Sequence, residues 1–145
     1  LFLPLNLISQ WVHEIQKFLR PEIRIYKILG VQDLKGIDMN KLCTEYDIVI
    51  TTFYFVRFCR GYTDMVDSAL GGRPRTRASI SCWCRQKNHS EPVLEAVHWR
   101  RIIVDEIHHT FDRQRDMRLL QLFSSDALWG LSGTPVLDTE QAQIL

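Results

Sequence analysis

The sequence predicts an α/β domain in which a parallel sheet is flanked by helices. Three compact apolar runs, at residues 47–52, 101–104 and 127–131, lack the regular alternation of a half-exposed strand. Such runs are typical of strands buried on both faces of a parallel sheet. Between the last two runs, apolar residues at helical spacing predict a crossover helix over 117–123. Strands that alternate with helices in this way indicate a parallel sheet.

Two further elements precede these runs. Apolar residues recur at helical spacing over 7–19, after the candidate N-cap Asn6 and before the helix-breaking Pro21, which predicts an amphipathic helix. Alternation over 23–28 predicts a short strand that ends near Gly30. We expect a turn-rich, weakly helical stretch between this strand and the next.

The composition is that of an ordinary globular domain. The chain has 145 residues, of which 46% are hydrophobic and 24% charged, enough for one modest core. A net charge of +1 excludes neither an acidic nor a basic partner, because a basic face can coexist with a neutral total. The 4 cysteines are too sparse for a secreted disulfide framework, so we expect free thiols in a reducing compartment. Since no stretch reaches the roughly 18 apolar residues of a membrane helix, we expect a soluble protein with no membrane partner.

Residues 61–97 lack a sustained period and contain Gly, Pro and Asn, which predicts an inserted surface loop. Lys and Arg outnumber Asp and Glu by nine to four between residues 57 and 101, so the loop is expected to be basic. Arg73, Arg75 and Arg77 are the centre of this excess. Two interpretations stay open for them: contact with DNA or an acidic nucleosome surface, and a disordered, solvated insertion.

Four aromatic side chains need a role. Trp11, Phe18 and Trp129 lie on an apolar helical face or on a strand, so we expect them in the core rather than stacked on nucleic acid bases. Trp99 is expected to pack beneath the strand that ends at Asp105.

The chemistry is expected where the buried strands end. Ligands of open parallel sheets bind beyond the carboxyl ends of the strands. Here Asp105 and Glu106 follow one apolar strand, and Ser132–Thr134 follow the next. An aspartate at this place can hold Mg²⁺ that bridges nucleotide phosphates. A neighbouring glutamate can then orient or deprotonate the attacking water, which makes Glu106 the candidate base.

His108 is expected to hydrogen-bond across to the turn formed by Ser132, Gly133 and Thr134, and so to report the nucleotide state. The simpler alternatives are a solvated strand end, an ordinary Ser–Gly–Pro turn and half-exposed loop histidines. For His109 the exposed-loop interpretation is preferred.

Four segments together resemble one family. They are Pro4–Trp11 with the following helix, Asp47–Phe53, His98–His108, and Leu131–Pro135. They resemble, in this order, motif Ia, a strand near the tracked DNA strand, motif II and motif III of superfamily-two helicases. Within that fold they are most similar to the Swi/Snf-related ATPases, particularly the branch with a long insertion and RING-type ubiquitin-ligase modules.

The resemblance implies that residues 1–145 form part of a RecA-like P-loop NTPase lobe, from motif Ia to just past motif III. It implies ATP and Mg²⁺ as cofactors. It gives Asp105 and Glu106 the motif II roles and makes His108 a third residue of the catalytic set. Ser132, Gly133 and Thr134 would contact the nucleotide together with Asp105, and Ser132 and Thr134 would link hydrolysis to DNA contact.

The resemblance also places Thr51 and Thr52 near the tracked strand. Two departures from the family pattern stand out in this sequence. It has no Gly-x-x-x-x-Gly-Lys-Ser/Thr loop to hold phosphates, and Ile107 stands where the family usually has Ala. Since the family's second lobe supplies arginine fingers, the chain alone is not expected to hydrolyse ATP.

The expected function is that of a nuclear, DNA-dependent ATPase that moves on duplex DNA, in chromatin remodelling or DNA repair. Duplex DNA and the nucleosome are its expected partners. Two alternatives stay open. One is a non-catalytic lobe that binds DNA or proteins as a scaffold. The other is a lobe that positions a RING-type ubiquitin ligase on chromatin, with partners from the ubiquitin pathway.

Overall fold

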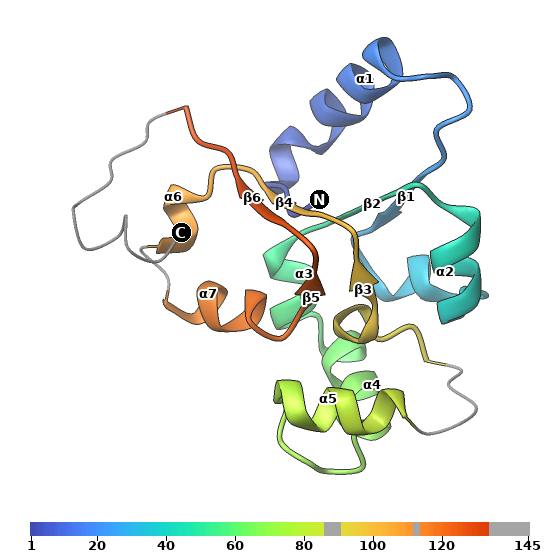
Figure 1. The fold of residues 1–145 in the computed structure, drawn as a ribbon, viewed down its shortest axis with the longest axis vertical. Helices are drawn as coiled ribbons and strands as arrows, with labels where there is room; N and C mark the ends of the chain where they lie inside the picture. The colour runs from blue at the N-terminus through green and yellow to red at the C-terminus, as the bar shows by residue number, and fades with distance from the viewer. Residues whose placement is uncertain (86–90, 112–113, 134–145) are drawn as a thin grey trace.

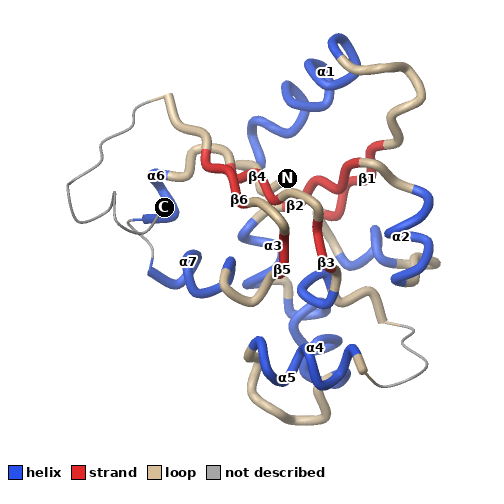
Figure 2. Tube along the Cα trace, viewed as in Figure 1, coloured by secondary structure: helices blue, strands red, loops and turns tan. Residues whose placement is uncertain are grey.

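A parallel sheet forms the centre of the molecule, with α1 on one side and most other helices on the opposite side (Figures 1 and 2). The structure is a computed structural model, and it describes residues 1–85, 91–111 and 114–133. Its strands are β1 (Ile25–Ile28), β2 (Ile48–Thr51), β3 (His98–Trp99), β4 (Ile102–Val104), β5 (Ser124–Ser125) and β6 (Leu128–Gly130). The pairs β1–β2, β3–β5 and β4–β6 are all parallel, so the predicted fold class is confirmed.

The first residues of the chain join the two halves of this sheet. Phe2 pairs in parallel with Thr51 of β2 and with Val104 of β4. The Phe2 amide donates to the carbonyl of Ile103 at 2.8 Å, and the Asp105 amide donates to the carbonyl of Phe2 at 3.0 Å. The spatial order is therefore β1, β2, the first residues, β4 and β6. Because every pair is parallel, the carboxyl ends of these segments meet at one edge.

The helices are α1 (Ile8–Phe18), α2 (Met39–Glu45), α3 (Phe53–Phe58), α4 (Arg60–Ala69), α5 (Arg77–Cys84), α6 (His108–Phe111) and α7 (Gln114–Leu120). Short 3-10 turns occupy Leu5–Leu7, Val31–Leu34 and Leu94–Ala96. Side chains cap three of the helices in the manner expected at N-termini: Asp38 caps α2, Thr52 caps α3 and Thr76 caps α5.

The predicted helix over 7–19 is confirmed as α1, which a 3-10 turn precedes. The N-cap prediction was wrong: Leu7, not Asn6, occupies that position, and it makes no side-chain capping bond. The crossover helix predicted over 117–123 is present as α7, which begins and ends three residues earlier. Residues 121–123 form a turn that leads into β5 instead.

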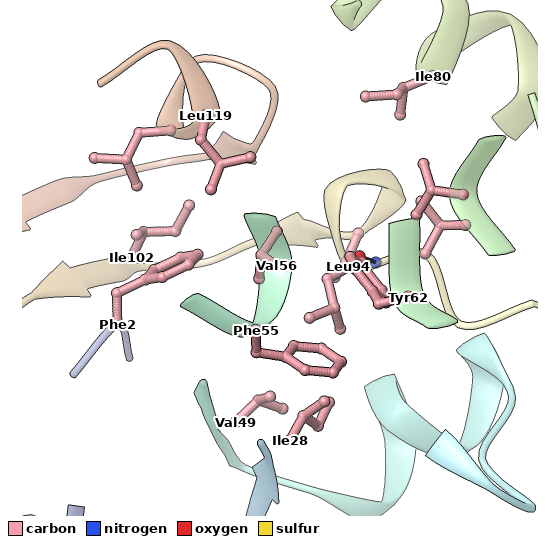
Figure 3. Packing of buried hydrophobic residues seen from close by; sticks show 14 of the residues in the cluster. Phe2, Ile28, Val49, Phe55, Val56, Tyr62, Ile80, Leu94, Ile102 and Leu119 are labelled. Atoms are coloured by element: carbon pink, nitrogen blue, oxygen red, sulfur yellow. Dashed lines mark hydrogen bonds between the residues drawn. The ribbon is translucent and has the colours of Figure 1, made fainter. Parts of the chain in front are cut away.

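Strand β2 shows why the apolar runs lack alternation. Val49 packs into a large cluster on one side of the sheet, while its neighbour Ile50 packs on the other side with Leu3, Ile8 and Ile15. Successive side chains of a strand point to opposite faces, so a strand covered on both faces is apolar at every position. Figure 3 shows the large cluster, which runs from Phe2 and Ile102 through Phe55 to Tyr62 and Ile80.

The prediction of an irregular loop over 61–97 was wrong for the part that the structure describes. Helices α4 and α5 occupy most of it, and their apolar side chains are buried in the large cluster: Tyr62, Val66, Leu70, Ile80 and Trp83. The first three follow a spacing of four, which is helical. The glycines at 71 and 72 interrupt this pattern, and both adopt positive φ, which lets the chain reverse between the two helices.

A buried ion pair holds three parts of the insertion together: α4, the loop before α5 and the 3-10 turn at Leu94–Ala96. Glu95 is fully buried, and its carboxylate accepts hydrogen bonds from the Tyr62 hydroxyl and the Arg75 guanidinium. Arg75 Nη2 also donates to the carbonyl of Val56 in α3 at 3.2 Å. Burial raises the pKa of Tyr62 and lowers that of Arg75, so the phenol stays protonated. Both buried groups have the Glu95 carboxylate as their hydrogen-bond acceptor.

The two neighbouring arginines also bond within the fold. Arg77 Nη1 donates to the carbonyls of Glu95 and Leu122, at 3.2 and 3.0 Å. Arg73 Nε donates to the carbonyl of Leu70 at 2.8 Å. The interpretation of these arginines as a disordered, solvated segment was therefore wrong. Contact with DNA or a nucleosome surface stays a prediction.

The expected core positions of the aromatics are only partly confirmed. Trp11 and Trp99 pack partly buried against the two clusters. Phe18 is 72% exposed and Trp129 is 50% exposed. The core prediction was therefore wrong for these two rings: Phe18 is the last residue of α1, and β6 lies at the edge of the sheet in the described part of the chain. Lys17 lies over the Phe18 ring and Arg101 over the Trp129 ring.

Replacing Glu95 with alanine is expected to destabilise the domain by roughly 3–5 kcal/mol, because it leaves the buried Arg75 without its counter-charge. Urea unfolding followed by circular dichroism measures this change. The exposed Glu45 at the end of α2 provides the control, and Glu45→Ala should change the stability by less than about 0.5 kcal/mol. Equal effects of the two substitutions would contradict the structural role of Glu95.

Candidate active site at the carboxyl edge of the sheet

The polar residues predicted to carry the chemistry lie at the same edge of the sheet. Thr51 ends β2, Asp105 follows β4 directly, and Ser132 follows β6 after one residue. β4 and β6 pair in parallel, so their carboxyl ends, which carry Asp105 and Ser132, lie side by side. The sequence-based expectation about their proximity is confirmed by the hydrogen bonds described next.

Asp105 is held at both carboxylate oxygens. Its Oδ1 accepts the amide N–H of Glu106 at 2.9 Å, and its Oδ2 accepts the indole N–H of Trp11 at 2.7 Å. Its own amide is bonded to the strand formed by Phe2. Asp105 is thus half-buried, with a fixed orientation, where the first segment and β4 end together.

Glu106 adopts a positive φ of 50°, and it is the one non-glycine residue with positive φ among the described residues. The left-handed region costs a side-chain-bearing residue roughly 1–2 kcal/mol. Such strain tends to be retained where a side chain must be aimed. The turn directs the chain from β4 into α6 and leaves the Glu106 carboxylate partly exposed beside Asp105.

His108 connects the two strand ends, as the sequence predicted. Its Nδ1 lies 2.7 Å from the Ser132 hydroxyl and 3.3 Å from a carboxylate oxygen of Glu106. One imidazole nitrogen therefore faces both the candidate base and the turn after β6. His109 is exposed, but it lies in α6 and not in the expected loop. Thr134 lies outside the described residues, and Gly133 is the last described residue of the turn.

Thr51 and Thr52 are both buried, and both hydroxyls are used inside the fold. The Thr51 hydroxyl donates to the carbonyl of Ile28 at 2.8 Å. The Thr52 hydroxyl accepts the amide N–H of Phe55 at 2.9 Å and so caps α3. The two threonines thus fix β2 and α3. Their predicted contact with a nucleic acid strand stays a prediction.

A cavity of about 250 Å³ lies between the first loop, the β2–α3 turn and the segment after β4. Its lining residues are Phe2, Leu3, Pro4, Leu5, Thr52, Phe53, Tyr54, Asp105, Glu106, His109, Thr110 and Asp116. Asp116 is buried, and its Oδ1 pairs with Nη1 of Arg57 at 2.6 Å, which ties α7 to α3. The cavity gives a ligand access to both candidate carboxylates.

The sequence reasoning missed three of the residues around this edge: Trp11 as a partner of Asp105, and the Arg57–Asp116 pair. Trp11 and Asp105 are 94 positions apart and Arg57 and Asp116 are 59 positions apart, so no local sequence pattern predicts these contacts. Only the similarity of the Gln–Trp segment to motif Ia gave a signal that Trp11 lies near the site.

The donor set fits a nucleotide-bound magnesium ion better than a metal cage made of protein ligands alone. Mg²⁺ favours one or two carboxylates and completes its shell with water and phosphate oxygens. Asp105 and its neighbour Glu106 at the mouth of the cavity provide this kind of incomplete site. Within residues 1–85, 91–111 and 114–133, no group of three or more His, Cys, Asp and Glu side chains could hold a metal by itself.

Ile107, unusual at this motif position, is accommodated by a glycine on the neighbouring strand. Ile107 is buried, and a Cβ placed on Gly130 would lie 2.5 Å from its Cδ1 and 2.9 Å from its Cγ2. The absence of a side chain at Gly130 is therefore what leaves room for Ile107 between β4 and β6.

Gly130→Ala is expected to destabilise the domain by about 1–3 kcal/mol, through overpacking against Ile107. Combining it with Ile107→Ala should cost less than the sum of the two single changes, because the second substitution removes the clash. Thermal unfolding of the four proteins in this cycle gives the coupling. Gly30→Ala is the control, since a Cβ there meets nothing within 4 Å. Additivity within about 0.5 kcal/mol would contradict the packing described.

Comparison with known proteins agrees with this geometry. Residues 1–143 match the family model of the SNF2-related domain. The chain is also 26% identical, over 144 residues, to an F-box protein of Arabidopsis thaliana, and this similarity covers 97% of the chain but only 8% of that relative. In the part of the chain that the structure describes, no helix is long and apolar enough to cross a membrane. The match over nearly all of its length shows that the chain belongs to the SNF2-related domain family of helicase-like proteins.

Proposed function

We propose that this chain supplies the metal-binding and hydrolytic carboxylates of a DNA-dependent ATPase that moves along duplex DNA, in chromatin remodelling or DNA repair. The observation that carries the proposal is the pair Asp105 and Glu106 at the end of β4, linked through His108 to Ser132 at the end of β6. Family membership supports an ATPase-type, helicase-like protein that uses a nucleotide and Mg²⁺. The chain spans 8% of the relative it matches, so the activity of the whole protein is part of the proposal.

Each residue of the pair has a distinct task. Asp105 binds the cation, and its fixed orientation reduces the rearrangement that binding requires. When bound, Mg²⁺ supplies positive charge next to the phosphate oxygens of the nucleotide. Glu106 follows the cation ligand in the chain. Its carboxylate is partly exposed and takes no part in the hydrogen bonds from Trp11 and the Glu106 amide that hold Asp105. It therefore orients the attacking water and accepts its proton.

His108 gives the site a route to the neighbouring strand. Its Nδ1 faces both Glu106 and Ser132, so a shift of the Glu106 carboxylate during hydrolysis changes the balance between the two contacts. Ser132 is two positions before Thr134 in the sequence, and the family resemblance connects both residues with DNA. The proposed link between hydrolysis and movement therefore runs from β4 to the turn after β6.

Duplex DNA, the nucleosome and a nuclear location belong to the same proposal. They rest on the motif resemblance in the sequence and stay untested expectations. Tyr54, which lies in the first turn of α3 and lines the cavity, is 73% exposed and therefore accessible to a partner at this edge. Partners from the ubiquitin pathway remain an expectation of the sequence alone.

Glu106→Gln in the full-length protein tests the proposal. The substitution keeps the size of the side chain and removes its basicity, so DNA-stimulated ATP hydrolysis should fall by roughly 10²–10⁴-fold. ATP binding, measured by equilibrium titration with a fluorescent analogue, should be retained. Glu45→Gln, on the exposed end of α2, should leave both quantities unchanged.

Hydrolysis at the wild-type rate in the Glu106→Gln protein would contradict the proposed base. If the wild-type protein did not hydrolyse ATP, and the Glu106→Gln variant kept DNA binding and the cellular role, the scaffold alternative would replace the ATPase. A ubiquitin-ligase role would then be tested by assaying ubiquitin transfer by the same variant.

A further inference from the structure

The indole of Trp11 contacts the candidate metal ligand directly. Trp11 Nε1–H donates to Asp105 Oδ2 at 2.7 Å, and the two residues are 94 positions apart in the chain. The rest of the ring packs partly buried against the small cluster under α1, which contains Leu3, Ile8 and Ile15. Figure 1 shows that α1 begins beside the sheet edge where β4 ends. The ring is thus held by packing while its N–H is aimed at the carboxylate.

The chemistry of the indole suits a carboxylate that must later bind a cation. An indole N–H is a donor only, and its hydrogen bond to an ionised acceptor is stronger than one between neutral groups. Unlike Arg or Lys, the indole carries no charge, so it orients Asp105 without neutralising it. A carboxylate has about four acceptor positions, and Trp11 and the Glu106 amide use two of them. The remaining positions stay available to a cation or its water ligands.

We propose that Trp11 is a positioning residue for magnesium: its hydrogen bond holds Asp105 in the orientation that binds the cation, and so couples the placement of α1 to metal affinity. This inference rests on the proposed function, because it assigns Trp11 a role at the same site. Its distinctive consequence is an effect on metal affinity rather than on nucleotide affinity or on folding.

The chain provides a matched control. Trp99 also donates its indole N–H, in this case to the carbonyl of Leu94 at 3.1 Å, and it is partly buried like Trp11. Trp99→Phe therefore removes an equivalent N–H from a bond that does not involve Asp105. The comparison separates the loss of a buried indole donor from the loss of the donor to the carboxylate.

The experiment uses the full-length protein with Trp11→Phe, with Trp99→Phe, and with benzothienylalanine at position 11, which keeps the two-ring shape but has no N–H. Binding of Mn²⁺ is measured by electron paramagnetic resonance in the presence of saturating ADP. ADP binding is measured separately without divalent metal. Both changes at position 11 should weaken Mn²⁺ binding roughly tenfold, as is typical for the loss of a group that orients a metal ligand. ADP binding without metal, and Mn²⁺ binding by Trp99→Phe, should match the wild type.

Three results would overturn the inference. Wild-type Mn²⁺ affinity in both position-11 variants would show that the hydrogen bond does not position Asp105. A loss in Trp11→Phe that benzothienylalanine restores would assign the effect to ring shape. If wild-type protein neither bound Mn²⁺ with ADP nor hydrolysed ATP, the proposed function would fail first, and the role of Trp11 would fall with it.

Discussion

The pairing of the first residues of the chain with both β2 and β4 is the interaction on which the rest of the structure depends. Phe2 forms parallel bridges to both strands, and its ring stacks on Phe53 with centroids 4.7 Å apart. The segment therefore joins the two strand pairs into one sheet and fills the space between them. It also fixes the position of Asp105 at the carboxyl end of β4, because the Asp105 amide donates to the Phe2 carbonyl. The segment then continues into α1, which places Trp11 over the same carboxylate.

Residues 61–97, the insertion predicted from the sequence, extend the hydrophobic core and do not interrupt it. The two helices α4 and α5 bury their apolar faces in the cluster that covers the sheet. Arg75, paired with Glu95 inside the insertion, donates to the Val56 carbonyl of α3. The local excess of basic residues therefore has an internal explanation in part: guanidinium groups satisfy buried acceptors at the junction. A count of charges along the chain cannot distinguish these arginines from arginines that face a partner, because the distinction lies in contacts between distant residues.

The strands and the main polar residues of the site could be predicted from the sequence because their signals are local. An apolar run followed at once by Asp105 specifies both a buried strand and the side chain at its end, and the parallel arrangement implies the contact between His108 and Ser132. The helices of the insertion were missed because the pair of glycines breaks a period that Tyr62 and Val66 otherwise follow. The Trp11–Asp105 bond could not be predicted, since it depends on how α1 lies against the finished sheet.

The central claim is that Asp105 and Glu106 hold and use a nucleotide-bound cation at the carboxyl edge of the sheet. A structure of the full-length protein with Mg²⁺ and a non-hydrolysable ATP analogue tests it most directly. We expect the cation beside the Asp105 carboxylate, with the Trp11 bond intact and Glu106 facing the terminal phosphate. A nucleotide bound away from this edge, or Asp105 and Ser132 on opposite sides of the sheet in the bound state, would contradict the account.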